Sequence, residues 1–128
     1  MARASLTVDT PSFTSVALTA TAVDAADTGD GDAFDNDGRT YALVINIDAA
    51  DTLTFDVVSG GTVDGLAVAD QTSTVAIGVL IGLTTAKIFG PFSASTWNQP
   101  SGDFIGQVEI DYTGTAAAIT DSTISVFH

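Results

Sequence analysis

The 128-residue sequence contains no cysteine and only one lysine, one histidine and one glutamate. Without cysteine the chain forms neither disulfides nor thiolate metal sites. Its longest apolar run, residues 75–83, includes two glycines and falls well short of the about 20 residues that a membrane-spanning helix needs. The first ten residues have no apolar core of signal-peptide length. We therefore expect that the protein is not an integral membrane protein.

Basic residues are also scarce. Three Lys and Arg stand against sixteen Asp and Glu, which gives a formal charge of −13. Binding to nucleic acid or to an anionic membrane requires bases that neutralise phosphates, so neither partner is expected. An Asp-rich, Lys-poor surface favours a high-salt habitat, because the Debye length falls to about 3 Å near 1 M salt. The alternative is an ordinary acidic extracellular or virion protein that avoids nonspecific association.

What is present is period-2 alternation with many β-branched residues, typical of strands. The length suits one domain, residues 1–128. We predict an all-β fold: an antiparallel β-sandwich of about eight short strands, jelly-roll-like. The predicted strands are residues 13–23, 41–48, 52–58, 62–68, 72–77, 85–92, 103–113 and 118–127.

The pattern also predicts how two of these strands lie. In 41–48 the residues Tyr41, Leu43, Ile45 and Ile47 share one face, and the strand is expected to form a hairpin with 52–58. A third strand, 62–68, is expected to kink at its glycine. The connections 24–38 and 92–102 are too long for simple hairpins, which argues against an up-and-down barrel.

Catalytic chemistry has little support in the sequence. The single histidine, His128, is the last residue, where chains usually fray. Most aspartates are expected in turns or on outward strand positions, and Glu109 and Asp111 are expected to face water, so no carboxyl is predicted to have the raised pKa of a general acid. We expect no enzyme.

The segment 24–41 holds six aspartates and three glycines. An EF-hand alignment on Gly38 fails, because Ala33 and Val44 occupy the first and last ligand positions. The aspartates are then either solvated turn formers, which the turn chemistry of Asp and Gly favours, or a looser calcium cage. No other cofactor is expected. The candidate cage ligands are Asp30, Asp32, Asp35 and Asp37.

The only tryptophan, Trp97, lies beside Asn98 in a predicted loop. Two interpretations are open. Trp97 and Asn98 anchor an interface, since aromatic residues are enriched at binding hot spots, or the indole closes one end of the sandwich over the core, which is the more frequent case.

Several short motifs occur in a fixed order. In that order the motifs resemble small virion proteins of tailed viruses, in which an N-x-G-R turn leads into a strand and G-P-F precedes an aromatic-Asn turn. The resemblance implies a head decoration or cement protein that binds the major capsid protein lattice and other virion proteins at the capsid surface, as a homo-oligomer with a trimer favoured. The acidic bias fits a virus of a halophilic archaeon. The motifs are "FDNDGRTYALVIN" (34–46), "VDGLAVADQTSTV" (63–75), "IFGPF" (88–92), "WNQPSG" (97–102) and "GQVEIDYT" (106–113).

In such a protein, residues 1–12 are interpreted either as an extended N-terminal arm, with Arg3 pairing with an acidic capsid surface, or as a disordered tail. Two other functions stay open. One is a tail, neck or spike-base component of the virion. The other is a cell-surface module that binds sugar or protein, with or without calcium.

Overall fold

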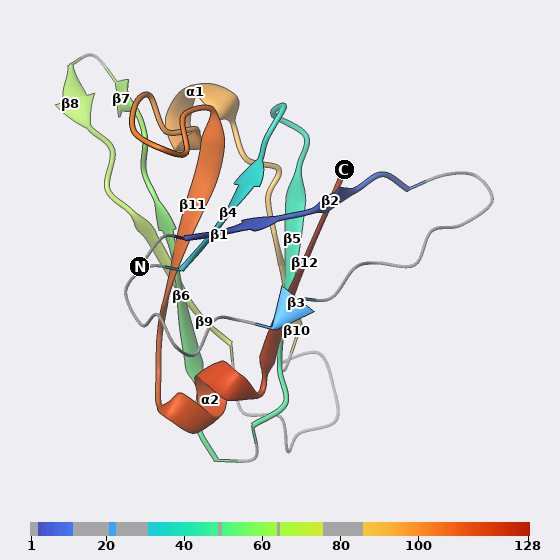
Figure 1. Cartoon of the computed structure of the whole chain (residues 1–128). Coiled ribbons are helices and arrows are strands. Elements are labelled where there is room, and N and C mark those ends of the chain that lie inside the picture. Colours follow the sequence, from blue (N-terminus) through green and yellow to red (C-terminus); the bar gives the residue numbers. More distant parts are fainter. Residues whose placement is uncertain (1–2, 12–20, 23–30, 49, 64, 76–85) are drawn as a thin grey trace.

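The computed structural model describes residues 3–11, 21–22, 31–48, 50–63, 65–75 and 86–128. Its strands form two five-stranded sheets that face each other (Figure 1), so the all-β sandwich prediction is confirmed. Sheet A has the order β1 (Ala4–Leu6), β4 (Asp32–Asp35), β11 (Gln107–Thr113), β6 (Leu53–Val58) and β9 (Gln71–Val75). Sheet B has the order β10 (Ala86–Phe89), β5 (Tyr41–Asn46), β12 (Ser122–Phe127) and β2 (Val8–Asp9), with β3 (Thr21–Ala22) also paired to β12.

The sheets are mixed, not purely antiparallel as predicted. β1 runs parallel to β4, and β2 runs parallel to β12. The N-terminal segment therefore adds an edge strand to both sheets, so for its described residues neither the extended arm nor the disordered tail is observed. The physical reason is that Leu6 is apolar and, at 8% exposure, joins the core.

The predicted hairpin between 41–48 and 52–58 is also wrong. β5 lies in sheet B between β10 and β12, whereas β6 lies in sheet A between β11 and β9. The connection between them crosses from one sheet to the other. Asn46 fixes this corner, because its side chain accepts from the backbone N–H of Asp48 (2.9 Å) and donates to the carbonyl of Asp51 (2.9 Å).

Three further strand predictions need correction. Where one strand, 62–68, was predicted, β7 (Thr62–Val63) and β8 (Leu66–Ala67) pair as a small antiparallel hairpin, and Gly65 between them has a φ of 80°, which favours a reversal of the chain. Residues 116–120 form helix α2 (Ala116–Thr120), where a strand from 118 was predicted. The strands β1, β2 and β4 were missed altogether, and the strand predicted from residue 103 begins only at Gln107. Of the predictions at 13–23 and 72–77, residues 13–20, 23 and 76–77 lie outside the described residues.

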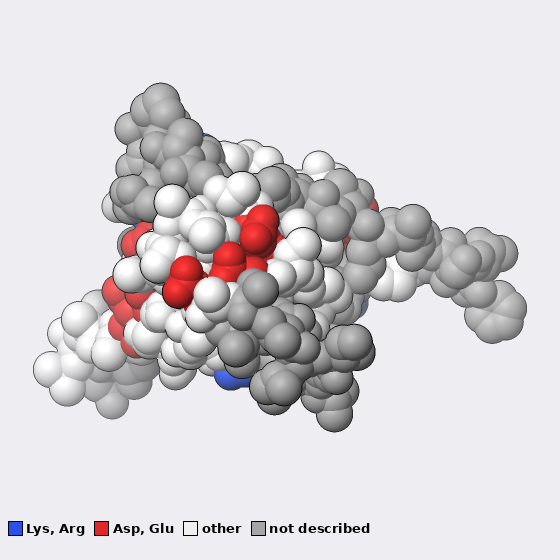
Figure 2. Space-filling view, turned by 90° about the horizontal axis from the view of Figure 1, so that it is seen from below, with Lys and Arg blue, Asp and Glu red and all other residues white. Residues whose placement is uncertain are grey.

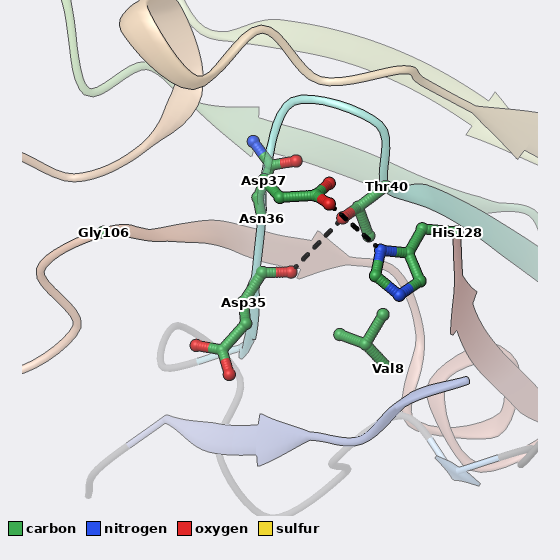
Figure 3. A pocket seen from close by; sticks show the side chains of 7 residues that line it. All are labelled: Val8, Asp35, Asn36, Asp37, Thr40, Gly106 and His128. Carbon is green, nitrogen blue, oxygen red and sulfur yellow. Dashed lines mark hydrogen bonds and ion pairs between the residues drawn. The ribbon is translucent and has the colours of Figure 1, made fainter. Parts of the chain in front are cut away.

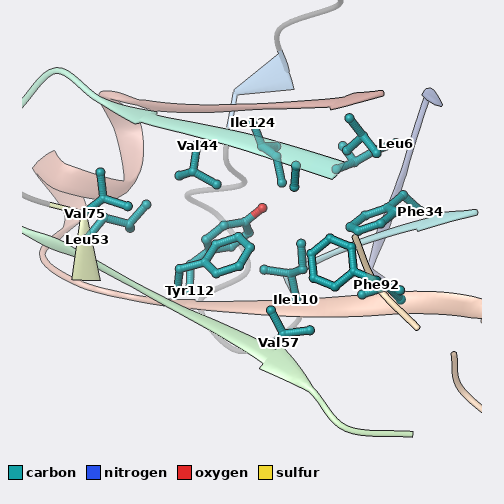
Figure 4. Packing of buried hydrophobic residues seen from close by; sticks show 14 of the residues in the cluster. Leu6, Phe34, Val44, Leu53, Val57, Val75, Phe92, Ile110, Tyr112 and Ile124 are labelled. Carbon is teal, nitrogen blue, oxygen red and sulfur yellow. The ribbon is translucent and has the colours of Figure 1, made fainter. Parts of the chain in front are cut away.

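The core fills the space between the inner faces of the sheets (Figure 4). Phe55 is central: its ring stacks on Phe89 at 4.3 Å and meets Tyr112 edge-on at 5.9 Å. Phe34 packs against Phe92 at 5.5 Å. These rings come from both sheets and from the segment after β10, so aromatic packing holds the layers together.

A short helix lies at each end of the sandwich (Figure 1). α1 (Ala94–Trp97) follows β10, and α2 is capped at its N-terminus by Thr115, whose hydroxyl accepts from the N–H of Ala118 at 3.3 Å. Within the described ranges, no helix has the length and apolar character to cross a membrane.

Candidate functional site

A hollow of about 440 Å³ lies beside the turn between β4 and β5 (Figure 3). We call it the His128 hollow. Its lining combines carboxylates, an amide, a hydroxyl and the only imidazole of the chain, which are the groups that hydrogen-bond polar ligands. The lining residues are Val8, Asp35, Asn36, Asp37, Thr40, Gly106 and His128.

The turn that forms one wall of the hollow is held by its own side chains. Asn36 accepts from the N–H of Gly38, and Asp37 accepts from the N–H of Arg39, each at 3.0 Å. The φ of Gly38 is 91°, which the glycine adopts at no steric cost. The hydrogen bond from the Arg39 backbone, helped by the charges of Arg39 and His128, lowers the pKa of Asp37.

His128 links this turn to the N-terminal segment. Its Nδ1 lies 3.3 Å from the Asp37 carboxylate, and its Nε2 lies 2.8 Å from the Thr10 hydroxyl. The imidazole is therefore held, where fraying was expected. The order hydroxyl, imidazole, carboxylate is also that of acyl-transfer enzymes. Here, however, Thr10 precedes Pro11, which has no N–H to stabilise an oxyanion next to the hydroxyl. Through these contacts His128 clamps the C-terminus to the N-terminal segment and to the β4–β5 turn.

The three candidate calcium ligands that lie in the described residues, Asp32, Asp35 and Asp37, do not come together. Asp30 lies outside the described residues. Asp32 points into the core and Asp35 points out, because they are an odd number of residues apart on β4. Asp35 accepts from the side chain of Gln107 at 2.8 Å, and Asp37 belongs to the turn described above. Among the described residues, no three metal-ligating side chains are grouped.

Asp32 has a structural role that the sequence did not reveal. Its carboxylate accepts from the Tyr112 hydroxyl at 2.8 Å, and both side chains are buried between the sheets. Burial, together with the negative charge of Asp32, raises the pKa of Tyr112 well above its usual value. The phenol therefore stays protonated and keeps donating to the carboxylate.

Arg3 is bound within the molecule. Its guanidinium lies 2.6 Å from Asp111 and 3.4 Å from Glu109, and it donates to the carbonyl of Ile110 at 2.8 Å. The side chain is only 15% exposed. The prediction that Arg3 pairs with a capsid surface is therefore corrected: in the structure it pairs with residues of β11. The same contacts correct the expectation that Glu109 and Asp111 simply face water. Gly31 permits the close approach of this region, because a Cβ there would collide with the Ile110 carbonyl oxygen and would lie 2.8 Å from the Arg3 guanidinium.

Trp97 lies in α1, not in a loop. It is half-buried and packs against the core cluster, which matches the interpretation that it closes one end of the sandwich. Nearby, the N–H of Gly60 donates to the carbonyl of Thr96 at 3.1 Å. A Cβ on Gly60 would collide with the Asn98 carbonyl oxygen, so the glycine permits this close approach.

Asn98 pairs with Asn36. Asn36 donates to the Asn98 side-chain oxygen at 2.7 Å and to the Phe92 carbonyl at 2.9 Å. Asn98 donates back to the backbone carbonyl of Asn36 at 3.1 Å. The two amides therefore join the β4–β5 turn to the segment that carries α1.

These contacts gather distant parts of the chain at one end of the sandwich. We call this the α1 end, made of the described residues 36–40, 60–63, 65–68 and 90–106. Two large apolar side chains there face solvent: Leu66 of β8 is 75% exposed and Ile105 is 65% exposed. Sequence reasoning missed both, although each follows or precedes a glycine in a turn.

The opposite end, around α2, is acidic. Viewed from this end, Asp and Glu side chains gather at the centre and basic atoms show only at the margin (Figure 2). Asp51 accepts from Thr115 at 2.8 Å. Asp48 accepts from the N–H groups of Ala50 (2.8 Å) and Asp51 (2.6 Å), and these bonds lower its pKa.

Comparison of the chain with protein-family models, with curated proteins and with solved structures finds no match.

Proposed function

We propose that the protein is a non-enzymatic structural component of a tailed virus, which decorates or cements the head by binding the lattice of the major capsid protein. The observation that carries this proposal is the convergence at the α1 end. The motifs that resemble virion proteins are spread over residues 34–113, yet parts of several of them meet there through the contacts of Asn36, Gly60 and Asn98. A shared surface is a reason for such motifs to occur together.

Leu66 and Ile105 are the groups that would bind the lattice. Burying one such side chain contributes about 1.5–3 kcal/mol as an upper limit. A standard interface covers about 1,600 Å² in total, so these two side chains would form the apolar centre of a larger polar contact. Many copies on one shell would add avidity without new contacts.

The acidic remainder of the surface fits the same role. Its carboxylates would keep the exposed part of the protein hydrated and prevent association with the packaged nucleic acid. In a high-salt medium their mutual repulsion would be screened. We therefore place the proposed virus in a saline habitat.

The His128 hollow favours one alternative. Its amide, carboxylate and hydroxyl groups suit the hydroxyls of a sugar, so a surface-binding module, carried by the virus tail or by a cell, is the second candidate. Such a module would use the hollow and leave Leu66 and Ile105 without a role.

The test is binding to virus particles that lack the protein, measured by co-sedimentation. Leu66→Asp and Ile105→Asp should each weaken binding at least about tenfold, equivalent to about 1.4 kcal/mol. The matched control is Thr120→Asp, which adds the same charge to an exposed residue of α2. Equal binding by all three variants, or loss of binding only for Thr120→Asp, would contradict the proposed surface. Binding of wild-type protein to purified tails but not to heads would favour the alternative.

A further inference from the structure

β5 turns its larger side chains away from the core. Its inward positions hold the buried Ala42, Val44 and Asn46. Its outward positions hold the half-buried Tyr41, Leu43 and Ile45. A strand with only one buried face normally shows the opposite distribution, with large apolar residues inward and polar residues outward.

Neighbouring strands extend this surface. Ile88 of β10 lies opposite Leu43, and Phe127 of β12 lies opposite Tyr41, with the two rings stacked at 5.7 Å. Ile47, which continues the alternation of β5, is 67% exposed and Ile88 is 63% exposed. We call this surface the apolar face of sheet B. It consists of Tyr41, Leu43, Ile45, Ile47, Ile88 and Phe127.

The face is also almost free of charge. The other outward positions of β10 and β12 are Ala86, Thr123 and Ser125. Among the described strand residues on this side, Asp9 alone is charged, and it lies on the edge strand β2 beside Phe127. A molecule with a net charge of −13 thus keeps one sheet face nearly without carboxylates. A large apolar surface with a polar rim is typical of a protein interface.

We propose that two copies of this chain pair through the apolar face of sheet B. Charge selects the partner: most other surfaces of the molecule would bring carboxylates against carboxylates, whereas this face meets its own copy without that repulsion. A two-fold axis places the same patch on both sides, and two sheets can pack face to face about 10 Å apart. A ring of three copies would need two different patches, so this face favours a dimer over the trimer expected from the resemblance.

The test is the mass of the purified protein by sedimentation equilibrium near 1 M salt, where long-range repulsion is screened. Wild type should be a dimer. Ile88→Asp and Ile47→Asp should each raise the dissociation constant at least about tenfold. The matched control, Thr74→Asp, adds the same charge to the exposed outer face of sheet A and should stay dimeric. Circular dichroism of each variant shows whether it keeps its strands, and a folded Ile47→Asp decides the question if Ile88→Asp unfolds.

A wild type that stays monomeric at high concentration, or that forms a trimer, would overturn the dimer. So would Ile47→Asp and Ile88→Asp variants that dimerise as the wild type does. A monomeric wild type whose Ile88→Asp variant loses binding to virus particles would assign the face to the capsid instead. The inference does not depend on the proposed function, because Leu66→Asp changes the α1 end and should leave the dimer intact.

Discussion

The outer faces of the two sheets are built from different residues. On sheet A, outward positions carry Asp35, Asp56, Glu109 and Asp111, among threonines. On sheet B, outward positions of β5, β10 and β12 carry the apolar face defined above. Both sheets alternate with the same period and cover the same core, yet their outer faces differ. The charged face of sheet A is suited to water, and we propose that the apolar face of sheet B meets a second copy of the chain.

On the acidic face of sheet A, one arginine offsets part of the repulsion between the carboxylates. Asp56 and Asp111 are directly opposite each other on β6 and β11, an arrangement that destabilises a sheet. Arg3 lies against Asp111 and Glu109 and offsets part of this repulsion. One of the three basic residues is therefore used to hold the N-terminal strand on the acidic face.

The largest expected effect tests which way each strand faces. Phe55→Ala removes an inward ring of β6 and should lower the free energy of unfolding by about 3–5 kcal/mol. Leu43→Ala removes an outward side chain of β5 and should cost less than about 1 kcal/mol in the monomer. Urea unfolding of dilute protein measures both. Equal losses would mean that Leu43 belongs to the core and that the two faces do not differ as described.

Removing Arg3 should have the next largest effect. Arg3→Gln leaves Asp111 and Glu109 without their cation, and their side chains are 35% and 19% exposed. We expect a loss of about 2 kcal/mol, smaller near 1 M salt than at low salt. Arg39→Gln is the matched control, since the Arg39 side chain is 82% exposed and its pairing contributes little. Similar losses for both variants would contradict the special role of Arg3.

The smallest expected effect is a gain. Asp56→Asn removes the charge opposite Asp111 and should stabilise the protein by about 0.5 kcal/mol at low salt. Near 1 M salt the gain should disappear, because the charges are screened. For the same reason the melting temperature of the wild type should rise with salt. A gain that is independent of salt would point to packing, not charge, as its cause.

Much of the architecture follows from local pattern. Strands were predicted at 52–58 and 103–113 because alternating apolar side chains and β-branched residues identify a half-buried strand, and the structure has them at Leu53–Val58 and Gln107–Thr113. Alternation divides the side chains of 41–47 into two sets, but it does not say which set faces the core. In the structure the smaller set, Ala42, Val44 and Asn46, faces the core, in which the large rings of Phe55 and Tyr112 fill much of the space.

The missed features depend on long-range contacts. β4 was hidden in an aspartate-rich segment, since only its pairing with β11 and the bond from Tyr112 make Asp32 a core residue. The hydrogen bond between His128 and Thr10 joins residues that lie more than a hundred positions apart in the sequence. No local spacing encodes such contacts. For Trp97 and Asn98 the sequence left two interpretations, an exposed interface or a cap over the core, because a short loop and a short helix have the same composition.

Electron cryo-microscopy of virus particles that carry the protein would test the central claim most directly, namely that this molecule acts through its surfaces and not through a catalytic site. The account predicts density on the head, with the α1 end against the capsid lattice and the acidic face of sheet A toward solvent. Density only on the tail, or an acidic face buried against the shell with Leu66 and Ile105 left in solvent, would contradict it.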